Sequence, residues 1–529
     1  MSDNGDVIKI EPTFDQAGNA NYQLISTEKG CNVEQQCVVY PEHVIPVIFV
    51  PGVMGSNLKS NKDDGESIWR LDSKTKVAGD WFGVNAMVRK MLLDPEQTQI
   101  DDDGLVVDKD EPFLLKNRRE RGWGSVGYTS YASFLDWLQN SLNDFNEYQR
   151  GERYRLLESV METETGDVTL SKDEVDLSYR YIYPVFAVGY NWLRSNADSA
   201  EYLGEKIDGI IKFYQTKGRK CEKVILITHS MGGLVARHYT QNLGGEKKVL
   251  GVVHGVMPAL GAAATYRRMK AGSENSGGPE GWIAAQVLGG DAKMMTAVLS
   301  QSPGPLQLLP GREYGRHWLK IIDGDNTYAY PQADPFEEIY LQRDKWWGLC
   351  DKQFINPERS HTQQEWNSDW EYFSIIIEKK VMKFIDGVSG KYHPNTYAFY
   401  SADSAFASYG EVCWQAKTPR LDGWLNRHRS RDARQGRVVD NTERFDKRTI
   451  SSPLSGSGWA KGIQQTYQIL PAAEAGDGTV PARSGRIAGH LVQARYQVSV
   501  EHEPAYQSPL AQQFTLRALV KIMQQMDLR

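Results

Sequence analysis

The chain has 529 residues, of which 40% are hydrophobic, and carries a formal net charge of −6. This length exceeds the roughly 100–200 residues usual for one domain, so the sequence predicts a large core with insertions, or two to three units. The slightly acidic balance argues against a nucleic-acid partner, and no window reaches the ~18 consecutive apolar residues that would span a bilayer.

The N-terminus, residues 1–6, lacks the basic-then-apolar pattern of a signal peptide. We therefore expect a soluble product of the cytoplasm, exported, if at all, by a route that reads no such peptide.

The five cysteines are too sparse, and odd in number, to form a disulfide framework. We expect free thiols at Cys31, Cys37, Cys221, Cys350 and Cys413. Without C-x-x-C or H-E-x-x-H, no metal or cofactor is expected. The run Asp101–Asp103 lacks the spaced ligands of a calcium loop, which favours a solvated turn.

In chain order, buried strands and helices alternate from residue 44 to residue 261. Residues 1–43 are polar and are predicted to form a surface arm. Apolar runs predict strands, and helical spacing predicts helices, at 44–50, 131–142, 185–190, 200–214, 224–229 and 249–256. Such alternation predicts an α/β fold with a mostly parallel sheet covered on both faces.

The alternation stops over residues 262–462, which we interpret as a cap inserted into the sheet domain. Most tryptophans of this segment are expected to fill the cap's own core, although some could line an acyl-chain groove. Residues 466–470 and 495–500 are predicted to be the last two strands, and residues 507–526 a closing helix. The predicted catalytic domain therefore comprises 44–261 and 463–529.

Ser230 has the surroundings of a nucleophile elbow, the strand-to-helix turn that exposes a serine above a sheet. An apolar strand precedes it, and Gly232 and Gly233 supply the small neighbours that a strained turn requires. Thr228 stands where the usual G-x-S-x-G pattern has its first glycine. The alternative is a buried serine at the start of an ordinary helix.

A serine nucleophile needs a base, and the base needs a carboxylate that orients it. In α/β-hydrolases the chain order is Ser, then Asp or Glu, then His. His502 follows the last predicted strand and is favoured over His490, which precedes it. We interpret His229 as structural.

Asp477 lies in the loop Gly476–Asp477–Gly478, just before the last strand. It is favoured as the acid over Asp323 and Asp440, which fall in the predicted cap; the alternative is an ordinary Asp-Gly turn. Backbone N–H groups stabilise the oxyanion of such reactions. Met231, which follows the nucleophile, is the expected first donor, and the second is expected from the loop 51–56.

Four segments together resemble the lecithin:cholesterol acyltransferase-like and GPI inositol-deacylase-like lipases, and are closest to bacterial type VI secretion lipase effectors. They are residues 50–58 (VPGVMGSNL), 228–233 (THSMGG), 306–310 (LQLLP) and 476–481 (GDGTVP). The resemblance implies an α/β-hydrolase fold, the triad Ser230, Asp477 and His502, and oxyanion donors at Met54 and Met231. It also implies hydrolysis of lipid acyl esters, often of phospholipids.

We therefore predict a serine lipase or phospholipase that acts at a membrane surface. If it is a secreted antibacterial effector, the producing cell needs an immunity protein. The alternatives are an acyltransferase, a soluble carboxylesterase, or a catalytically dead hydrolase fold that only binds. The basic stretch 427–437 could attract anionic head groups, but a solvated loop or a partner-binding segment is favoured.

Overall fold

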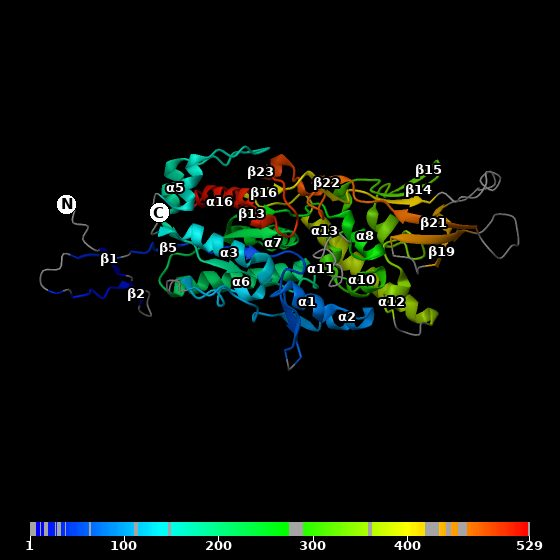
Figure 1. The fold of residues 1–529 in the computed structure, drawn as a ribbon, viewed down its shortest axis with the longest axis horizontal. Coiled ribbons are helices and arrows are strands. Elements are labelled where there is room, and N and C mark those ends of the chain that lie inside the picture. The colour runs from blue at the N-terminus through cyan, green and yellow to red at the C-terminus, as the bar shows by residue number, and fades with distance from the viewer. Residues whose placement is uncertain are drawn as a thin grey trace.

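The structure, a computed structural model, describes residues 7–10, 12–14, 20–26, 28, 33–37, 39–62, 65–109, 115–145, 150–274, 289–357, 362–417, 433–440, 446–452 and 463–526. The molecule is elongated, with two sheet-containing halves lying end to end and the first strands projecting from one end (Figure 1). These strands form two small pairs, β1 with β4 and β2 with β3: β1 (Val7–Ile10), β2 (Thr13–Phe14), β3 (Ala20–Asn21) and β4 (Glu34–Cys37).

The left-hand half in Figure 1 is built on a six-stranded, fully parallel sheet. Its strands, in spatial order, are β11 (Val185–Ala187), β6 (Val47–Val50), β12 (Val224–His229), β13 (Val249–Gly255), β16 (Thr396–Tyr400) and β23 (Ala494–Gln497). Every residue of β6, β12 and β13 is buried. Continuous burial is typical of parallel strands covered on both faces, which explains their uniformly apolar sequences.

Helices cover the two faces of this sheet. Val47 and Phe49 of β6 pack in one core with α3 (Tyr128–Leu142) and α16 (Pro509–Met523). Ile48 and Val50 pack in a second core with α6 (Asn196–Thr216) and α7 (Gly232–Asn242). Shorter elements of this half are the strand pair β5 (His43–Val44) and β10 (Tyr181–Ile182), and the helices α4 (Glu152–Arg155) and α5 (Lys172–Ser178), which contact each other.

The right-hand half contains a second six-stranded sheet of mixed direction. Its strands, in spatial order, are β15 (Asn326–Tyr330), β14 (Leu319–Asp323), β18 (Val412–Ala416), β21 (Ile463–Ile469), β20 (Lys447–Ser452) and β19 (Arg437–Asp440). The helices of this half are α8 (Ala263–Ala271), α10 (Ala292–Leu299), α11 (Pro303–Leu306), α12 (Gln363–Ile375) and α13 (Lys383–Val388). Its separate core contains the buried tryptophans Trp318, Trp346, Trp347, Trp370 and Trp414, so these five fill the interior as expected.

Two strand assignments from the sequence are wrong. β16 lies inside the segment 262–462, yet it is the fifth strand of the parallel sheet. Conversely, the sequence predicts a strand of that sheet at residues 466–470, but β21, which contains most of them, belongs to the second sheet. The chain leaves the first sheet after β13 and returns at β16. Elements of the right-hand half lie between these two strands in the sequence, and they interrupt the β-α alternation that would identify β16. The division into arm, catalytic domain and cap stays a prediction, with β16 moved to the catalytic domain and β21 moved to the cap.

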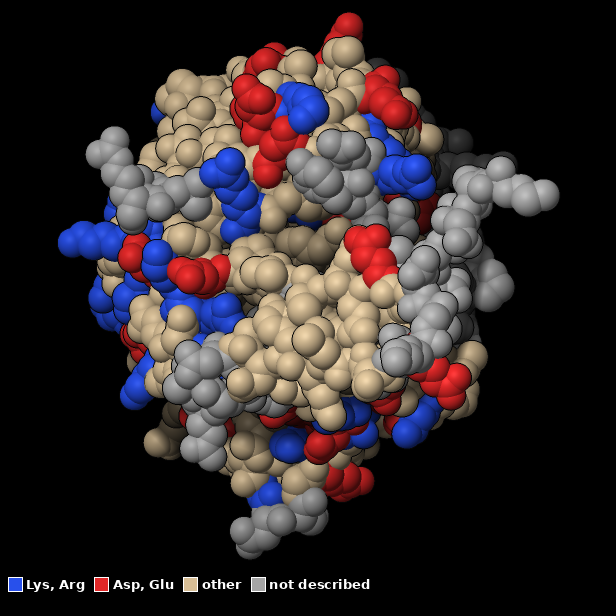
Figure 2. All heavy atoms as spheres, turned by 90° about the vertical axis from the view of Figure 1, so that its left-hand side faces the viewer, with Lys and Arg blue, Asp and Glu red and all other residues tan. Residues whose placement is uncertain are grey.

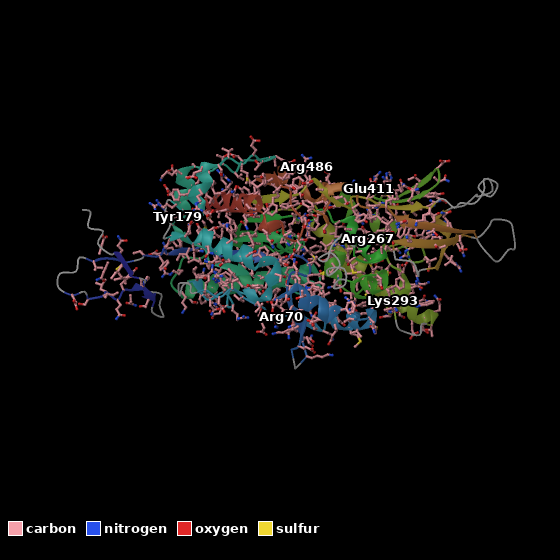
Figure 3. The ribbon with its side chains drawn as sticks, viewed as in Figure 1. Arg70, Tyr179, Arg267, Lys293, Glu411 and Arg486 are labelled. Atoms are coloured by element: carbon pink, nitrogen blue, oxygen red, sulfur yellow. The ribbon has the colours of Figure 1, made fainter. Side chains whose placement is uncertain are left out.

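A smaller three-stranded sheet lies beside the loop that follows β6, and two short helices join its strands β8 and β9 in the sequence. These elements are β7 (Leu58–Ser60), β8 (Ser67–Trp69), β9 (Thr98–Ile100), α1 (Lys74–Trp81) and α2 (Ala86–Leu92). Arg70, labelled in Figure 3, binds the buried Asp101 through Nε at 2.9 Å. Asp102 and Asp103 of the same turn are exposed, as expected of a solvated turn, so the ion pair with Arg70 anchors only its buried first residue.

The end of the molecule seen in Figure 2 mixes positive and negative side chains around a broad area of uncharged residues. None of the helices formed by the described residues is both long and apolar enough to cross a membrane. Cys37, Cys221, Cys350 and Cys413 are free, whereas Cys31 lies outside the described residues, as does most of the basic stretch 427–437.

Candidate active site

Ser230 occupies a tight turn between β12 and α7. Its φ of 52° lies in the left-handed region, which a residue other than glycine adopts only where its surroundings enforce it. The Ser230 amide donates to the carbonyl of Gly255 at the end of β13, at 3.0 Å. A Cβ atom at Gly233 would lie 2.3 Å from Sδ of the buried Met257, so a larger residue there would require that side chain to move. The turn thus has the geometry of a nucleophile elbow.

The structure brings Ser230, His502 and Asp477 into one hydrogen-bonded chain. Ser230 Oγ lies 2.9 Å from His502 Nε2, and His502 Nδ1 lies 2.7 Å from Asp477 Oδ2. A carboxylate only accepts, so His502 Nδ1 carries the proton and Nε2 is free to accept the hydroxyl hydrogen of Ser230. The arrangement suits general-base activation of the serine.

Asp477 is 3% exposed and is held by its own loop. Its Oδ1 accepts hydrogen bonds from the amides of Thr479 at 2.9 Å and Val480 at 2.6 Å. The backbone carbonyl of Asp477 accepts from the His502 amide at 2.9 Å, which joins the two loops directly. These contacts leave Oδ2 aimed at the imidazole.

The loop of Asp477 does not come straight from a strand of the parallel sheet. It follows β22 (Glu474–Gly476), which pairs with β17 (Asp403–Ser408) and is followed by α15 (Ala482–Gly485). The alternative residues lie elsewhere: Asp323 ends β14, Asp440 ends β19, and His490 is exposed just before β23. Within the described part of the chain, neither Asp323 nor His490 forms a hydrogen bond with Ser230.

The loop after β6 lies directly against the nucleophile. A Cβ atom at Gly52 would be 3.0 Å from Ser230 Cβ, and Met54 has a left-handed φ of 63°. Trp69 Nε1 donates to the Met54 carbonyl at 2.8 Å, which holds the loop from its other side. Met231 is the N-cap of α7, where the amides of a helix start have no intrahelical acceptor. Neither Met54 N–H nor Met231 N–H donates to another described group, as oxyanion donors require.

Thr228 replaces the first glycine of the usual motif without distorting the turn. Its side chain is fully buried, and Oγ1 lies 2.8 Å from His254 Nδ1 on the neighbouring strand. Tyr506 donates to the Thr228 carbonyl at 2.9 Å. Tyr131 and Tyr506 also contact residues of the elbow, and the sequence does not mark either of them. A lone tyrosine on an apolar helix face carries no signal of its own.

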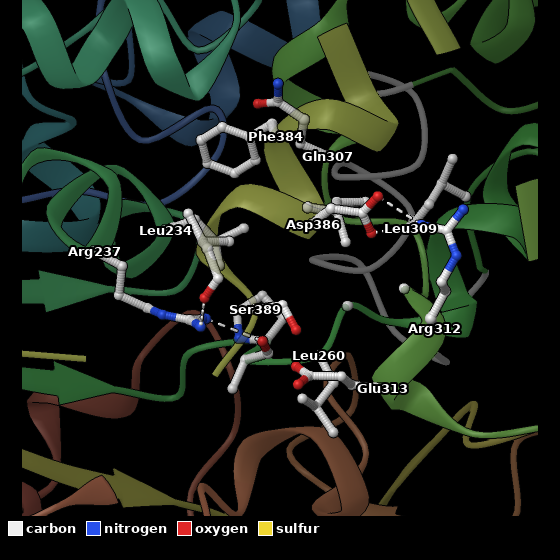
Figure 4. A pocket seen from close by; sticks show the side chains of 16 residues that line it. Leu234, Arg237, Leu260, Gln307, Leu309, Arg312, Glu313, Phe384, Asp386 and Ser389 are labelled. Atoms are coloured by element: carbon white, nitrogen blue, oxygen red, sulfur yellow. Dashed lines mark hydrogen bonds and ion pairs between the residues drawn. The ribbon is translucent and has the colours of Figure 1, made fainter. Parts of the chain in front are cut away.

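Two cavities formed by the described residues are not lined by Ser230. One of about 210 Å³ lies at the edge of the parallel sheet, beside Lys116, Tyr202 and Phe213. The second is smaller and lies between α7 and α13, with Arg237 and Arg312 on opposite sides (Figure 4). Neither cavity is lined by Ser230 or His502, and among the described residues no cluster could hold a metal ion.

Two of the matches found by comparison with known proteins bear on the fold. Residues 191–255, which contain the elbow, match the PGAP1-like alpha/beta domain family. A chain in the crystal structure of the Tle4–Tli4 complex is similar over 91% of this chain and 99% of its own length, with a TM-score of 0.75 and 28% sequence identity. Comparison with curated proteins gave no significant match. The two matches confirm the resemblance drawn from the sequence and the α/β-hydrolase fold that it implies.

Proposed function

We propose that this chain is a serine hydrolase that cleaves acyl esters of phospholipids, with Ser230 as nucleophile, His502 as base and Asp477 as its orienting acid. The observation that carries the proposal is the hydrogen-bonded chain from Ser230 through His502 to the buried Asp477. It lies at the carboxyl edge of a parallel sheet, where open α/β folds bind their ligands. The PGAP1-like domain and the likeness to Tle4 support the same reaction class.

In the proposed reaction, His502 Nε2 takes the hydroxyl proton as Ser230 Oγ attacks the ester carbonyl. The oxyanion accepts hydrogen bonds from Met54 N–H and Met231 N–H, where each donor is worth roughly 10²–10³ in kcat. The imidazolium then gives its proton to the leaving alcohol, here a lysophospholipid, and an acyl-enzyme remains. Water, deprotonated by the same imidazole, releases the fatty acid and restores the serine.

We further propose that the protein is a secreted antibacterial effector that is neutralised in the producing cell by an immunity protein. The likeness to a chain solved in complex with a second protein, Tli4, supports a protein partner. In this proposal the enzyme leaves the cell by a route that reads no signal peptide and reaches its substrate at a membrane surface.

The test is incubation of the purified protein and its Ser230→Ala variant with phosphatidylglycerol and phosphatidylethanolamine vesicles, with products identified by mass spectrometry. We expect lysophospholipid and free fatty acid from the wild type only. Equal, negligible release from both proteins would exclude a phospholipase. Labelling of Ser230 by a fluorophosphonate would then separate a soluble esterase, which reacts, from an inactive binding protein, which does not.

A further inference from the structure

A second chain of hydrogen bonds runs behind the nucleophile and includes no triad side chain. His229 Nε2 lies 2.8 Å from the backbone carbonyl oxygen of His502. On the other side of the ring, His229 Nδ1 lies 2.9 Å from the hydroxyl of Tyr131. That hydroxyl in turn accepts from the Gly52 amide, at 3.3 Å. The chain therefore joins the loop of the base to the loop that follows β6.

Only one arrangement of hydrogens satisfies this chain. The His502 carbonyl can only accept, so His229 Nε2 must carry the hydrogen. In a neutral ring Nδ1 is then the acceptor, so Tyr131 donates its hydroxyl hydrogen to it and accepts from Gly52. Burial, followed by the charge of His502, lowers the pKa of His229 to about 3, which keeps the ring neutral. Each member has a definite role as donor or acceptor.

Packing around the ring allows little movement. The centroids of the Tyr131, His502 and Tyr506 rings lie 5.6, 5.3 and 6.1 Å from that of His229. A Cβ atom at Gly52 would be 2.9 Å from His229 Nδ1, so the loop backbone lies directly on the histidine. His229 is 4% exposed and Tyr131 is 3% exposed, so water does not compete for these hydrogen bonds.

We infer that His229 is a positioning residue that holds two loops in place at once, the loop of His502 and the loop that follows β6. Through Nε2 it fixes the backbone of His502, and through Tyr131 it fixes Gly52, two residues before the proposed oxyanion donor Met54. Because His229 directly precedes Ser230, both loops are aligned on the nucleophile itself. This inference rests on the proposed function, and it gives His229 a positioning role where the sequence alone favours a structural one.

Variants of similar shape separate the two ends of this hydrogen-bonded series, the bond to His502 and the bond to Tyr131. His229→Gln places an amide N–H near Nε2, so it keeps the bond to His502 and loses the acceptor for Tyr131. His229→Asn places an oxygen near Nδ1, so it keeps Tyr131 and loses His502. Tyr131→Phe removes only the hydroxyl. The matched control is Tyr183→Phe, which removes a buried hydroxyl that donates to the Ser178 carbonyl at 2.6 Å, away from the site.

The readouts are hydrogen–deuterium exchange and steady-state kinetics on a soluble nitrophenyl ester. We expect faster exchange at residues 51–56 in His229→Gln and Tyr131→Phe, and at residues 500–504 in His229→Asn. In all three, kcat should fall about 10- to 100-fold with KM nearly unchanged, because a displacement of about 1 Å has effects of that size. Tyr183→Phe should change neither readout.

Unchanged exchange at both loops in the His229 and Tyr131 variants would overturn the inference, as would an equal loss of kcat in Tyr183→Phe. Failure of the proposed function looks different. In that case the wild type itself neither hydrolyses the ester nor reacts with a fluorophosphonate at Ser230, while the exchange measurement still decides whether His229 positions the two loops.

Discussion

A Cβ atom at Gly232 would lie 2.4 Å from the carbonyl oxygen of Val50, because the first turn of α7 passes over the end of β6. The carbonyl oxygen of Pro51 would be equally close. Both contacts are to backbone, which cannot move aside as a flexible side chain can. We expect Gly232→Ala to lower the free energy of unfolding by about 1–3 kcal/mol, the usual cost of overpacking, and to displace Ser230. Denaturant unfolding and ester hydrolysis measure the two effects.

Gly209 on α6 is the matched control, since no atom lies within 4 Å of the position a Cβ would take there. Alanine at an open helix position stabilises by about 0.5–1 kcal/mol. Equal stability of the two alanine variants would contradict the close approach at Gly232.

Asp477→Asn should abolish turnover while leaving the fold intact. The asparagine oxygen can still accept from Thr479 and Val480, so the loop keeps its shape. Its NH₂ group would face His502 Nδ1 and favour the tautomer with hydrogen on Nε2, which cannot accept the proton of Ser230. We expect kcat to fall about 10⁴-fold with little change in KM. A fall of less than tenfold would show that Asp477 does not hold the tautomer.

Most of the first half of the fold could be predicted, and the three proposed catalytic residues could be selected, because their signals are local. A buried parallel strand is uniformly apolar, and a glycine pair after Ser230 marks the elbow. The fixed order of nucleophile, acid and base then left few candidates, and Asp477 and His502 contact each other as that order requires.

The second sheet could not be predicted in the same way. Its strands come from residues 319–330, 412–416 and 437–469 and pair out of sequence order, so no alternating pattern marks them. β16 has a strand-like sequence, but only its pairing with β13 and β23 places it in the first sheet. Tyr131 contacts His229, which lies 98 residues further along the sequence, and this contact depends on the packing of α3 against the sheet.

A buried ion cluster in the second half should be essential for stability. Asp351 accepts from Lys270 Nζ at 2.9 Å and Arg448 Nη2 at 2.7 Å, and the two basic side chains are 0% and 2% exposed. Burial alone would raise the pKa of Asp351, but the charges of Arg448 and Lys270 lower it to about 2. Asp351→Asn leaves two buried cations without a counter-ion, which should cost about 3–5 kcal/mol of unfolding free energy.

The control for this cluster is Glu152→Gln, which breaks the exposed pair with Arg155. Pairs of this kind contribute less than about 1 kcal/mol, so the melting temperature should hardly change. A similar loss in both variants would mean that the buried cluster contributes no more than a surface pair.

Stability should fall on mild acidification, before most carboxylates are protonated. Burial lowers the pKa values of His229 and His254 to about 3, whereas histidine in an unfolded chain titrates near about 6.5. Between these values the unfolded chain binds more protons, so the stabilisation is complete above pH about 6.5 and is lost as pH falls toward about 3. Each histidine contributes a slope of about 1.4 kcal/mol per pH unit.

His254→Asn isolates one of these contributions. Its side-chain oxygen can still bond Thr228 Oγ1 in place of Nδ1, but it does not titrate. Denaturant unfolding of both proteins at about pH 7, 6 and 5 should give a shallower pH dependence for the variant, by about 1.4 kcal/mol per unit below the pKa of free histidine. Parallel curves for the two proteins would mean that His254 binds protons equally well in the folded and unfolded states, and that burial does not keep it neutral.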